Sequence, residues 1–444
     1  MDFLDPSWKN FIDPKEKFQL LMEELKATLK YNISDALYKE NISFIEEKTL
    51  KILNKEIDFS NFNKVCIITI GKGVIPLTKY LVEVLPKNIP IHSLVPKAIS
   101  YMLEDLPKNL TVYKGNHPIP DDDSFDSTEK LLKVIDDYSG KDLIILFISG
   151  GASSLFAKPA IPLTKDEYIQ LSERLLYSGL LIQDHNKYRA LIDDIKGGKL
   201  LRYLKCKSYT FYISDVVNDS LNTIGSGPTV KYQHFDLKFL RSNLQTLARH
   251  QEDLQKKIST LIYHFDGDSS NNENILFLKQ SIFADLLADR LKGKFLKVTR
   301  PEEAFSGNYE GITQNFGQSM GHFTTDQVCI LTGESSVKVP KQFKDGHGGR
   351  NQHFLISLIN EWIKRDYTRV IIISFATDGI DGNSKFAGGY FQVDSNKRKD
   401  KDLQVKLEHA LDHYSSSDFL DPENVLYTGR TGINFADVLI FYFF

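Results

Sequence analysis

Five short apolar runs, each ending at small or acidic residues, constrain the fold of this 444-residue chain more than any other feature. They read VCIITIGKG, LIILFISGG, YTFYISDV, QVCILTGE and VIIISFATDG. Runs of this length, rich in β-branched residues, are typical of strands buried on both faces. Amphipathic segments separate them, so the sequence predicts an α/β protein with largely parallel sheets.

We expect the chemistry at the ends of these strands, because ligands of open α/β sheets bind at the carboxyl ends of the strands. The expected ranges are 71–73, 149–154, 214–219, 332–335 and 377–382.

The sequence also contains signals for helix starts. Asp13 and Pro14 predict the start of a first helix, a second is expected after Ser34, and Thr164 with Glu167 forms a capping box.

Composition excludes several classes of protein. A hydrophobic content of 41% supports a large core, and the length of 444 residues favours two domains, whose boundary we place near residue 320. A net charge of -3 gives no long-range attraction for nucleic acid or an anionic membrane. The acidic start and the lack of a long apolar run predict a cytoplasmic protein. The three widely spaced cysteines predict reduced core residues.

Glycine-rich turns at the strand ends are candidate anion sites. Gly71, Lys72 and Gly73 combine a flexible backbone with a compact cation, although no G-x-G-x-x-G or Walker motif is present. The turn SGGASS at 149–154 offers backbone donors suited to phosphate, but its glycines would serve equally to pack a helix onto the sheet. The turns IKGGKL and GSGPT leave the same two interpretations open, and His117 lies in another turn, GNHPIPD.

Acidic residues follow two of the strands. Asp215 and Asp219 come after one, and Asp378 and Asp381 after another. Carboxylates at strand ends can hold Mg²⁺ or can orient and deprotonate an attacking hydroxyl. The alternative is helix capping and Asx turns, which aspartate also favours.

The segment GGRNQHF places Arg350 and Asn351 in the first turn of a helix with an apolar stripe that includes Phe354, Leu358 and Trp362. Free N–H groups, the helix dipole and a guanidinium there predict an anion site. An arginine on the surface beside a loop is the alternative.

Taken in order, IGKG, GNHPIPD, SGGASS, IKGGKL, SDVVND, GSGPT, LTGESSVKV, GGRNQ, ATDGIDG, AGG and TGRTGINFADV resemble the motifs of the class II glycerate 2-kinase family. The carboxy-terminal part of that family is called the MOFRL domain. The resemblance runs from about residue 60 to the end of the sequence.

The resemblance implies ATP- and Mg²⁺-dependent phosphorylation of D-glycerate to 2-phosphoglycerate. It implies a larger Rossmann-like domain, 1–320, and a smaller α/β MOFRL domain, 321–444, with the active site in the cleft between them. We expect a monomer or homodimer without nucleic-acid or membrane partners. Catalytic roles are implied for Lys72, Asp215, Arg350 and Asp378. Nucleotide or phosphate binding is implied for Ser149, Gly150, Gly151, Ser153, Lys196, Gly197, Gly198 and Asn351. Substrate or metal contacts are implied for Asp219, Glu334 and Asp381.

Three positions depart from the family pattern. His353 replaces the usual glutamate after RNQ, Asn218 replaces a glycine, and Thr332 replaces a glycine before Glu334. If that glutamate caps the helix or orients Arg350, a histidine would weaken the anion site. The alternatives are therefore a non-catalytic or altered-substrate relative that binds a nucleotide or sugar acid, and a hydroxypyruvate reductase, for which the dinucleotide fingerprint is missing.

Overall fold

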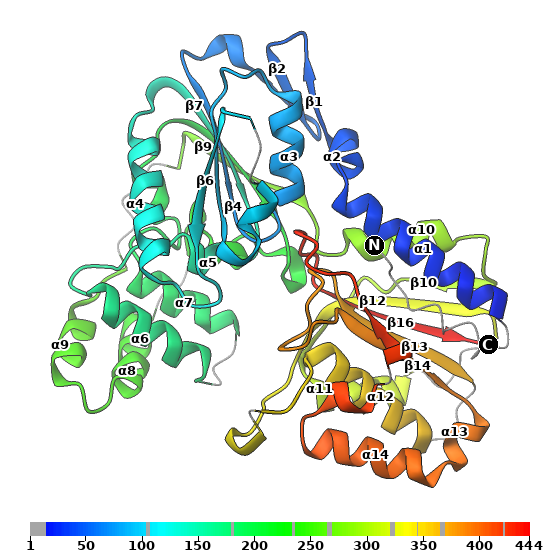
Figure 1. Cartoon of the computed structure of the whole chain (residues 1–444). Coiled ribbons are helices and arrows are strands. Elements are labelled where there is room, and N and C mark those ends of the chain that lie inside the picture. Colours follow the sequence, from blue (N-terminus) through cyan, green and yellow to red (C-terminus); the bar gives the residue numbers. More distant parts are fainter. Residues whose placement is uncertain are drawn as a thin grey trace. The chain divides into compact units, whose positions relative to one another are not determined.

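The computed structural model describes residues 15–103, 107–178, 182–232, 236–263, 269–319, 325–343, 345–364, 369–420 and 422–444. The chain divides into two compact units (Figure 1). Asp35–Asp215 and Asp219–Lys279 form one, called here the central unit. Met1–Ser34, Val216–Asn218 and Gln280–Phe444 form the carboxy-terminal unit. The boundary expected at 320 falls on residues outside the described ones, and residues 280–319 group with the carboxy-terminal unit.

The central unit contains a six-stranded sheet in the order β6-β5-β4-β7-β8-β9, with every pair parallel. Its strands are β4 (Val65–Ile70), β5 (Ile91–Pro96), β6 (Leu110–Gly115), β7 (Ser139–Ile148), β8 (Lys205–Ile213) and β9 (Asn272–Leu278). The strand order reverses between β4 and β7, as in doubly wound dinucleotide-binding folds. All of β4 is buried, as its continuous apolar run predicts. The predicted Rossmann-like parallel sheet is confirmed.

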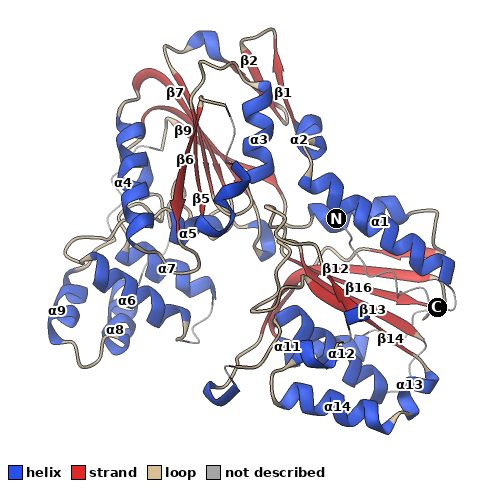
Figure 2. Ribbon diagram, viewed as in Figure 1, coloured by secondary structure: helices blue, strands red, loops and turns tan. Residues whose placement is uncertain are grey.

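The central unit also contains helices. They are α2 (Ala36–Asn41), α3 (Ile75–Val84), α4 (Asp122–Asp136), α5 (Ala152–Leu155), α6 (Lys165–Leu176), α7 (Ile182–Ile192), α8 (Leu237–Leu247) and α9 (Glu252–Thr260). The predicted capping box is present, because Glu167 N donates to Thr164 Oγ1 (3.3 Å) and Thr164 N donates to the Glu167 carboxylate (2.8 Å). Figure 2 shows α6 to α9 gathered into a cluster with its own apolar core. A small antiparallel sheet joins β1 (Ile42–Ile45), β2 (Thr49–Ile52) and β3 (Lys55–Asp58).

The carboxy-terminal unit has a second sheet in the order β10-β12-β16-β13-β14-β15, with β11 also beside β12. Its strands are β10 (Lys297–Thr299), β11 (Phe305–Asn308), β12 (Gln327–Ser336), β13 (Val370–Ala376), β14 (Gly388–Val393), β15 (Val425–Leu426) and β16 (Asp437–Phe443). Only β10 and β11 pair parallel to β12, and the other pairs are antiparallel. The prediction of parallel strands is therefore wrong for this sheet. A strand buried on both faces has the same apolar pattern in either direction, so the pattern could not show the difference.

Helices cover both faces of the second sheet (Figure 2). They are α1 (Lys15–Ile33), α10 (Ile282–Leu291), α11 (Tyr309–Ser319), α12 (Arg350–Lys364), α13 (Ser395–Lys399), α14 (Lys401–Asp412) and α15 (Ser416–Phe419). The predicted stripe of α12 is confirmed, since Phe354, Leu358 and Trp362 are fully buried. The first helix is present as α1, although Asp13 and Pro14 lie outside the described residues. Within the described part of the chain, no helix combines the length and apolarity needed to cross a membrane.

Candidate active site

Two predicted turns meet at the point where the strand order of the central sheet reverses. Lys72 N, just after β4, donates to Gly150 O (2.9 Å), just after β7. Gly73 N donates to Ser149 Oγ (3.0 Å). A side chain at Gly71, whose φ is 133°, would collide with Ser149 Oγ. The buried Ser149 hydroxyl, for which a phosphate contact was predicted, therefore joins the two strand ends.

Lys72 and His117 border the Gly150–Gly151 turn. A Cβ atom at Gly151, whose φ is 83°, would lie 3.4 Å from Lys72 Cγ and 3.2 Å from His117 Cδ2. Only glycine fits that backbone and that space without strain. Among the described residues, the N–H groups of Gly150 and Gly151 have no hydrogen-bond acceptor. A cation, an imidazole and backbone donors thus lie together at the carboxyl edge of the sheet.

Hydrogen bonds join this turn to the two other glycine turns of the central unit. Ser153 Oγ lies 2.7 Å from Ser226 Oγ, which in turn donates to Asn186 Oδ1 (2.8 Å). Gly197 N donates to Ser226 O (3.0 Å), and Gly198 N donates to Gly227 O (2.8 Å). The turns at 149–153, 197–198 and 225–227 therefore form one connected set of loops. The backbone donors of Gly197 and Gly198, predicted to bind phosphate, are used within that set.

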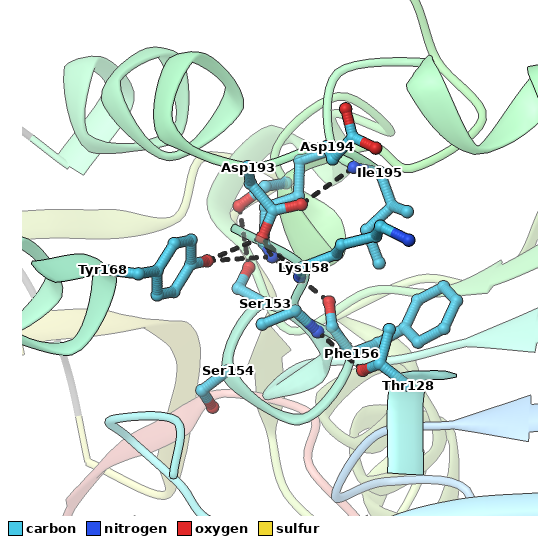
Figure 3. A network of polar contacts seen from close by, with 12 residues as sticks. Thr128, Ser153, Ser154, Phe156, Lys158, Tyr168, Asp193, Asp194 and Ile195 are labelled. Atoms are coloured by element: carbon cyan, nitrogen blue, oxygen red, sulfur yellow. Dashed lines mark hydrogen bonds and ion pairs between the residues drawn. The ribbon is translucent and has the colours of Figure 1, made fainter. Parts of the chain in front are cut away.

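Lys196 is fully buried in the central unit. Figure 3 shows Tyr168, Asp193 and Phe156 of the polar network around it. Its ammonium and the Asp193 carboxylate are fully buried and 2.5 Å apart. Lys196 Nζ also donates to Phe156 O (3.1 Å) and to the Tyr168 hydroxyl (3.3 Å). Asp193 accepts further hydrogen bonds from the Tyr168 hydroxyl (2.6 Å) and Lys158 N (3.2 Å). The Lys196 ammonium, for which phosphate binding was predicted, therefore directs its three hydrogen bonds to groups of the chain beneath the loops.

The loop after β8 carries Asp215 and Asp219, both half-buried. Asn218 has a φ of 69°, which is in the left-handed region. It stands at a sequence position where the family pattern has glycine. Asparagine tolerates this conformation better than most residues, so this departure is accommodated.

Charged candidates of the carboxy-terminal unit gather at one edge of the second sheet. The register places Gly333 of β12 and Ala376 of β13 on either side of Asp437, which begins β16. Arg350, at the start of α12, binds Asp437 through Nε (2.7 Å) and Nη2 (3.1 Å) and pairs with Glu334 through Nη1. A guanidinium has more N–H donors than these contacts use, so Arg350 can still reach a ligand.

We did not single out Asp437 from the sequence. It is fully buried, and burial raises its pKa. One sequence signal could have identified Asp437: it is an acidic residue at the start of an apolar run, DVLIFYF. The other acidic candidates follow the ends of such runs.

Asp381 caps α12. Its carboxylate accepts from Asn351 N (2.9 Å) and Gln352 N (2.8 Å), and burial raises the pKa of Asp381 to about 6. The Asn351 side chain is also buried and accepts from Ser374 Oγ (3.0 Å). The first-turn N–H groups predicted to bind an external anion are thus occupied by a carboxylate of the chain itself. Asp381 and Asn351 have structural partners at the positions where ligand contacts were predicted.

His353 lies inside the carboxy-terminal unit, between two tyrosines. The ring centroids are 4.7 Å from Tyr309 and 5.0 Å from Tyr414, which stacks on the imidazole. Neither ring nitrogen has a hydrogen-bond partner within the described residues, and burial lowers the pKa of His353 to about 4. Since Asp381 caps the helix and carboxylates orient Arg350, those tasks do not fall to residue 353.

The remaining candidates have local partners. Thr332 is buried and accepts from Gln280 Nε2 (3.0 Å). Asp378 is half-buried and accepts from Ile380 N (3.3 Å), a contact typical of an Asx turn. In the described ranges, no group of three or more His, Cys, Asp or Glu side chains is placed to hold a metal ion.

Fold and sites together define a two-unit α/β protein with glycine turns and a lysine at the reversal point of a doubly wound sheet. The profile of the family described as Domain of unknown function (DUF4147) matches residues 21–262, and that of the MOFRL family matches residues 327–437. The first match covers more than half of the chain, which therefore belongs to that family.

Known relatives match this chain along most of its length. A glycerate 2-kinase from Pyrococcus horikoshii is 27% identical over 91% of this chain and 92% of its own. Another from Picrophilus torridus is 28% identical over 90% of each chain. The crystal structure of a glycerate kinase from Thermotoga maritima has a TM-score of 0.73 at 24% identity, covers 97% of this chain and 100% of its own, and shows the same fold. The predicted membership of the class II glycerate 2-kinase family is confirmed.

Proposed function

We propose that this protein is a kinase that uses ATP and Mg²⁺ to convert D-glycerate into 2-phospho-D-glycerate. The observation that carries the proposal is the position of Lys72 beside the Gly150–Gly151 turn, where the strand order of the central sheet reverses. The proposal is supported by relatives named glycerate 2-kinase that match about nine-tenths of the chain.

In this proposal the central unit binds phosphate. The N–H groups of Gly150 and Gly151 donate to phosphoryl oxygens, and the Lys72 ammonium offsets their charge. Phosphoryl transfer depends mainly on positioning and on charge stabilisation, and these groups supply both.

The carboxy-terminal unit contributes an oriented guanidinium. Asp437 and Glu334 fix Arg350 so that its remaining N–H groups can bind the phosphoryl group or the glycerate carboxylate. Asp215 and Asp378, half-buried after strands β8 and β13, are the proposed carboxylates for orienting the acceptor hydroxyl and taking its proton.

Mg²⁺ fits the donor chemistry of the loop after β8. It prefers oxygen ligands and is usually held by one or two carboxylates together with substrate phosphates. Asp219 would hold it together with the nucleotide phosphates, and the ion would neutralise charge on those phosphates.

Two alternatives are less well supported. A non-catalytic relative was suggested by His353 and Thr332, but both side chains are buried and leave Lys72 and Arg350 in place. A nicotinamide-dependent reductase would need a glycine at the sixth position of a G-x-G-x-x-G motif after β4, where this chain has Pro76.

Phosphorus NMR of the protein with ATP, Mg²⁺ and D-glycerate tests the proposal. We expect a 2-phosphoglycerate signal, and Lys72→Ala should lower kcat by about 10² to 10³. Lys79→Ala is the matched control, because Lys79 is exposed on α3. An undiminished rate in Lys72→Ala, or no product from the unmodified enzyme, would refute the proposal.

A further inference from the structure

A chain of three side chains fixes the direction of a hydrogen bond beside the Gly150–Gly151 turn. Ser226 Oγ donates to Asn186 Oδ1 over 2.8 Å, and the hydroxyls of Ser226 and Ser153 are 2.7 Å apart. A hydroxyl has one proton to donate and two lone pairs that can accept. An amide oxygen only accepts, so the Ser226 proton is directed to Asn186.

The direction of the hydrogen bond from Ser226 to Asn186 determines the direction of the hydrogen bond between Ser226 and Ser153. Because Ser226 has no second proton, it must accept in its contact with Ser153, and Ser153 must donate. The remaining capacity of Ser153 Oγ is a lone pair. Toward a ligand, Ser153 therefore acts as a hydrogen-bond acceptor.

The surroundings hold this arrangement in place. Ser226 is fully buried and Asn186 is 4% exposed, so water does not compete for their polar atoms. Gly197 N donates to the Ser226 carbonyl (3.0 Å), which fixes the backbone of the turn. Ser153 is half-buried and ends the chain of three hydrogen-bonded side chains. It follows Gly151 by two residues.

We propose that Ser153 is a specificity-determining residue that accepts a hydrogen bond from a hydroxyl group of a bound substrate. The proposal rests on the proposed kinase function and replaces the phosphate contact predicted for Ser153. Phosphate oxygens are themselves acceptors, so an oxygen that presents only lone pairs repels them. A substrate hydroxyl supplies the missing proton, and it belongs to the sugar acid or to the ribose of the nucleotide.

Pairs of substrates that differ by one hydroxyl test the proposal. They are D-glycerate against D-lactate, ATP against 2′-deoxy-ATP, and ATP against 3′-deoxy-ATP. In one pair the unmodified enzyme should favour the hydroxyl-bearing member by about tenfold in kcat/KM. Ser153→Ala should bring that ratio close to one, and the affected pair identifies the source of the hydroxyl.

Two further variants separate recognition from structural damage. Ser226→Ala keeps Ser153 but removes the acceptor for its proton, so the preference should fall although Ser153 is present. Ser127→Ala is the control, because the Ser127 hydroxyl donates to Lys114 O (2.8 Å) and joins none of the connected loops. That control should retain the preference.

The outcomes distinguish this proposal from the proposed function. If Ser153→Ala weakens both members of every pair equally, or changes no ratio, Ser153 is not a hydroxyl acceptor. If the unmodified protein makes no phosphorylated product, the kinase proposal fails, and the same ratios are measured as dissociation constants by calorimetry. A preference lost in Ser153→Ala would then still support the acceptor role, whereas equal or absent binding of every pair would overturn it.

Discussion

Replacing Lys196 with methionine should lower the free energy of unfolding of the central unit by about 3 kcal/mol. Removing one partner of a buried ion pair usually costs about 3 to 5 kcal/mol, because the other charge remains buried without compensation. Asp193 would lose the ammonium at 2.5 Å but keep its bonds from the Tyr168 hydroxyl and Lys158 N, which favours the lower end of that range. Methionine has a similar volume, so a cavity adds little.

Hydrogen exchange followed by mass spectrometry measures this loss locally. Peptides from α6 and from residues 193–199 should exchange faster in Lys196→Met, whereas peptides from α12 should not change. Lys165→Met is the matched control, since Lys165 forms an exposed pair with Asp126 (2.8 Å) and should cost less than about 1 kcal/mol. The reasoning is refuted if Lys196→Met behaves like this control.

The double variant Asp193→Leu with Lys196→Met sharpens the comparison. With both charges gone, no unpaired charge remains in the interior, so the double variant should be more stable than Lys196→Met alone. A double variant that is less stable than the single one would show that the hydrogen bonds of Asp193, and not its charge, dominate.

Two further predictions concern pH and are measured as thermal midpoints between pH 4 and 7. Burial raises the pKa of Asp381 to about 6 from 3.8, so its stabilising contribution is full below pH 4 and is lost as pH rises through 6. Asp381→Asn should remove this dependence of the thermal midpoint on pH. If the midpoints of the variant and the unmodified protein change with pH in parallel, the raised pKa of Asp381 is contradicted. Burial lowers the pKa of His353 to about 4 from 6.5, so stability falls as pH drops from 6.5 toward 4. His353→Phe should abolish this loss and add about 1 to 2 kcal/mol at pH 7, because two unpartnered nitrogens are removed; an unchanged midpoint would refute it.

The sequence identified the strand ends well because glycine and acidic residues after apolar runs have direct physical causes. Gly71 and Gly151 are required by the close approach of two turns, and that requirement is visible in the sequence. Asp381 was also located correctly after β13, but its partner was not. Whether a carboxylate caps a helix or meets a ligand depends on tertiary contacts that spacing does not encode.

Other features depended on which face of an element is buried. Lys196 appeared to be a cation in a glycine turn, whereas its ammonium is held inside by Asp193, three residues earlier in the chain. His353 was compared with the usual glutamate of the family, and only the structure places it between Tyr309 and Tyr414. Asp437 escaped notice because the antiparallel direction of β16 brings its first residue, and not its last, to the charged edge.

The place of β16 has a consequence for the order of folding during synthesis. Every strand of the central sheet lies within residues 65–278, so all of its partners leave the ribosome before β12 is made. The second sheet instead has its middle strand at 437–443, later than both neighbours. Until that strand emerges, β12 and β13 have unpaired edges, which are templates for aggregation. A nascent chain halted before residue 437 would therefore carry a complete central sheet beside two exposed edges, and synthesis of the last strand is the step that protects the molecule.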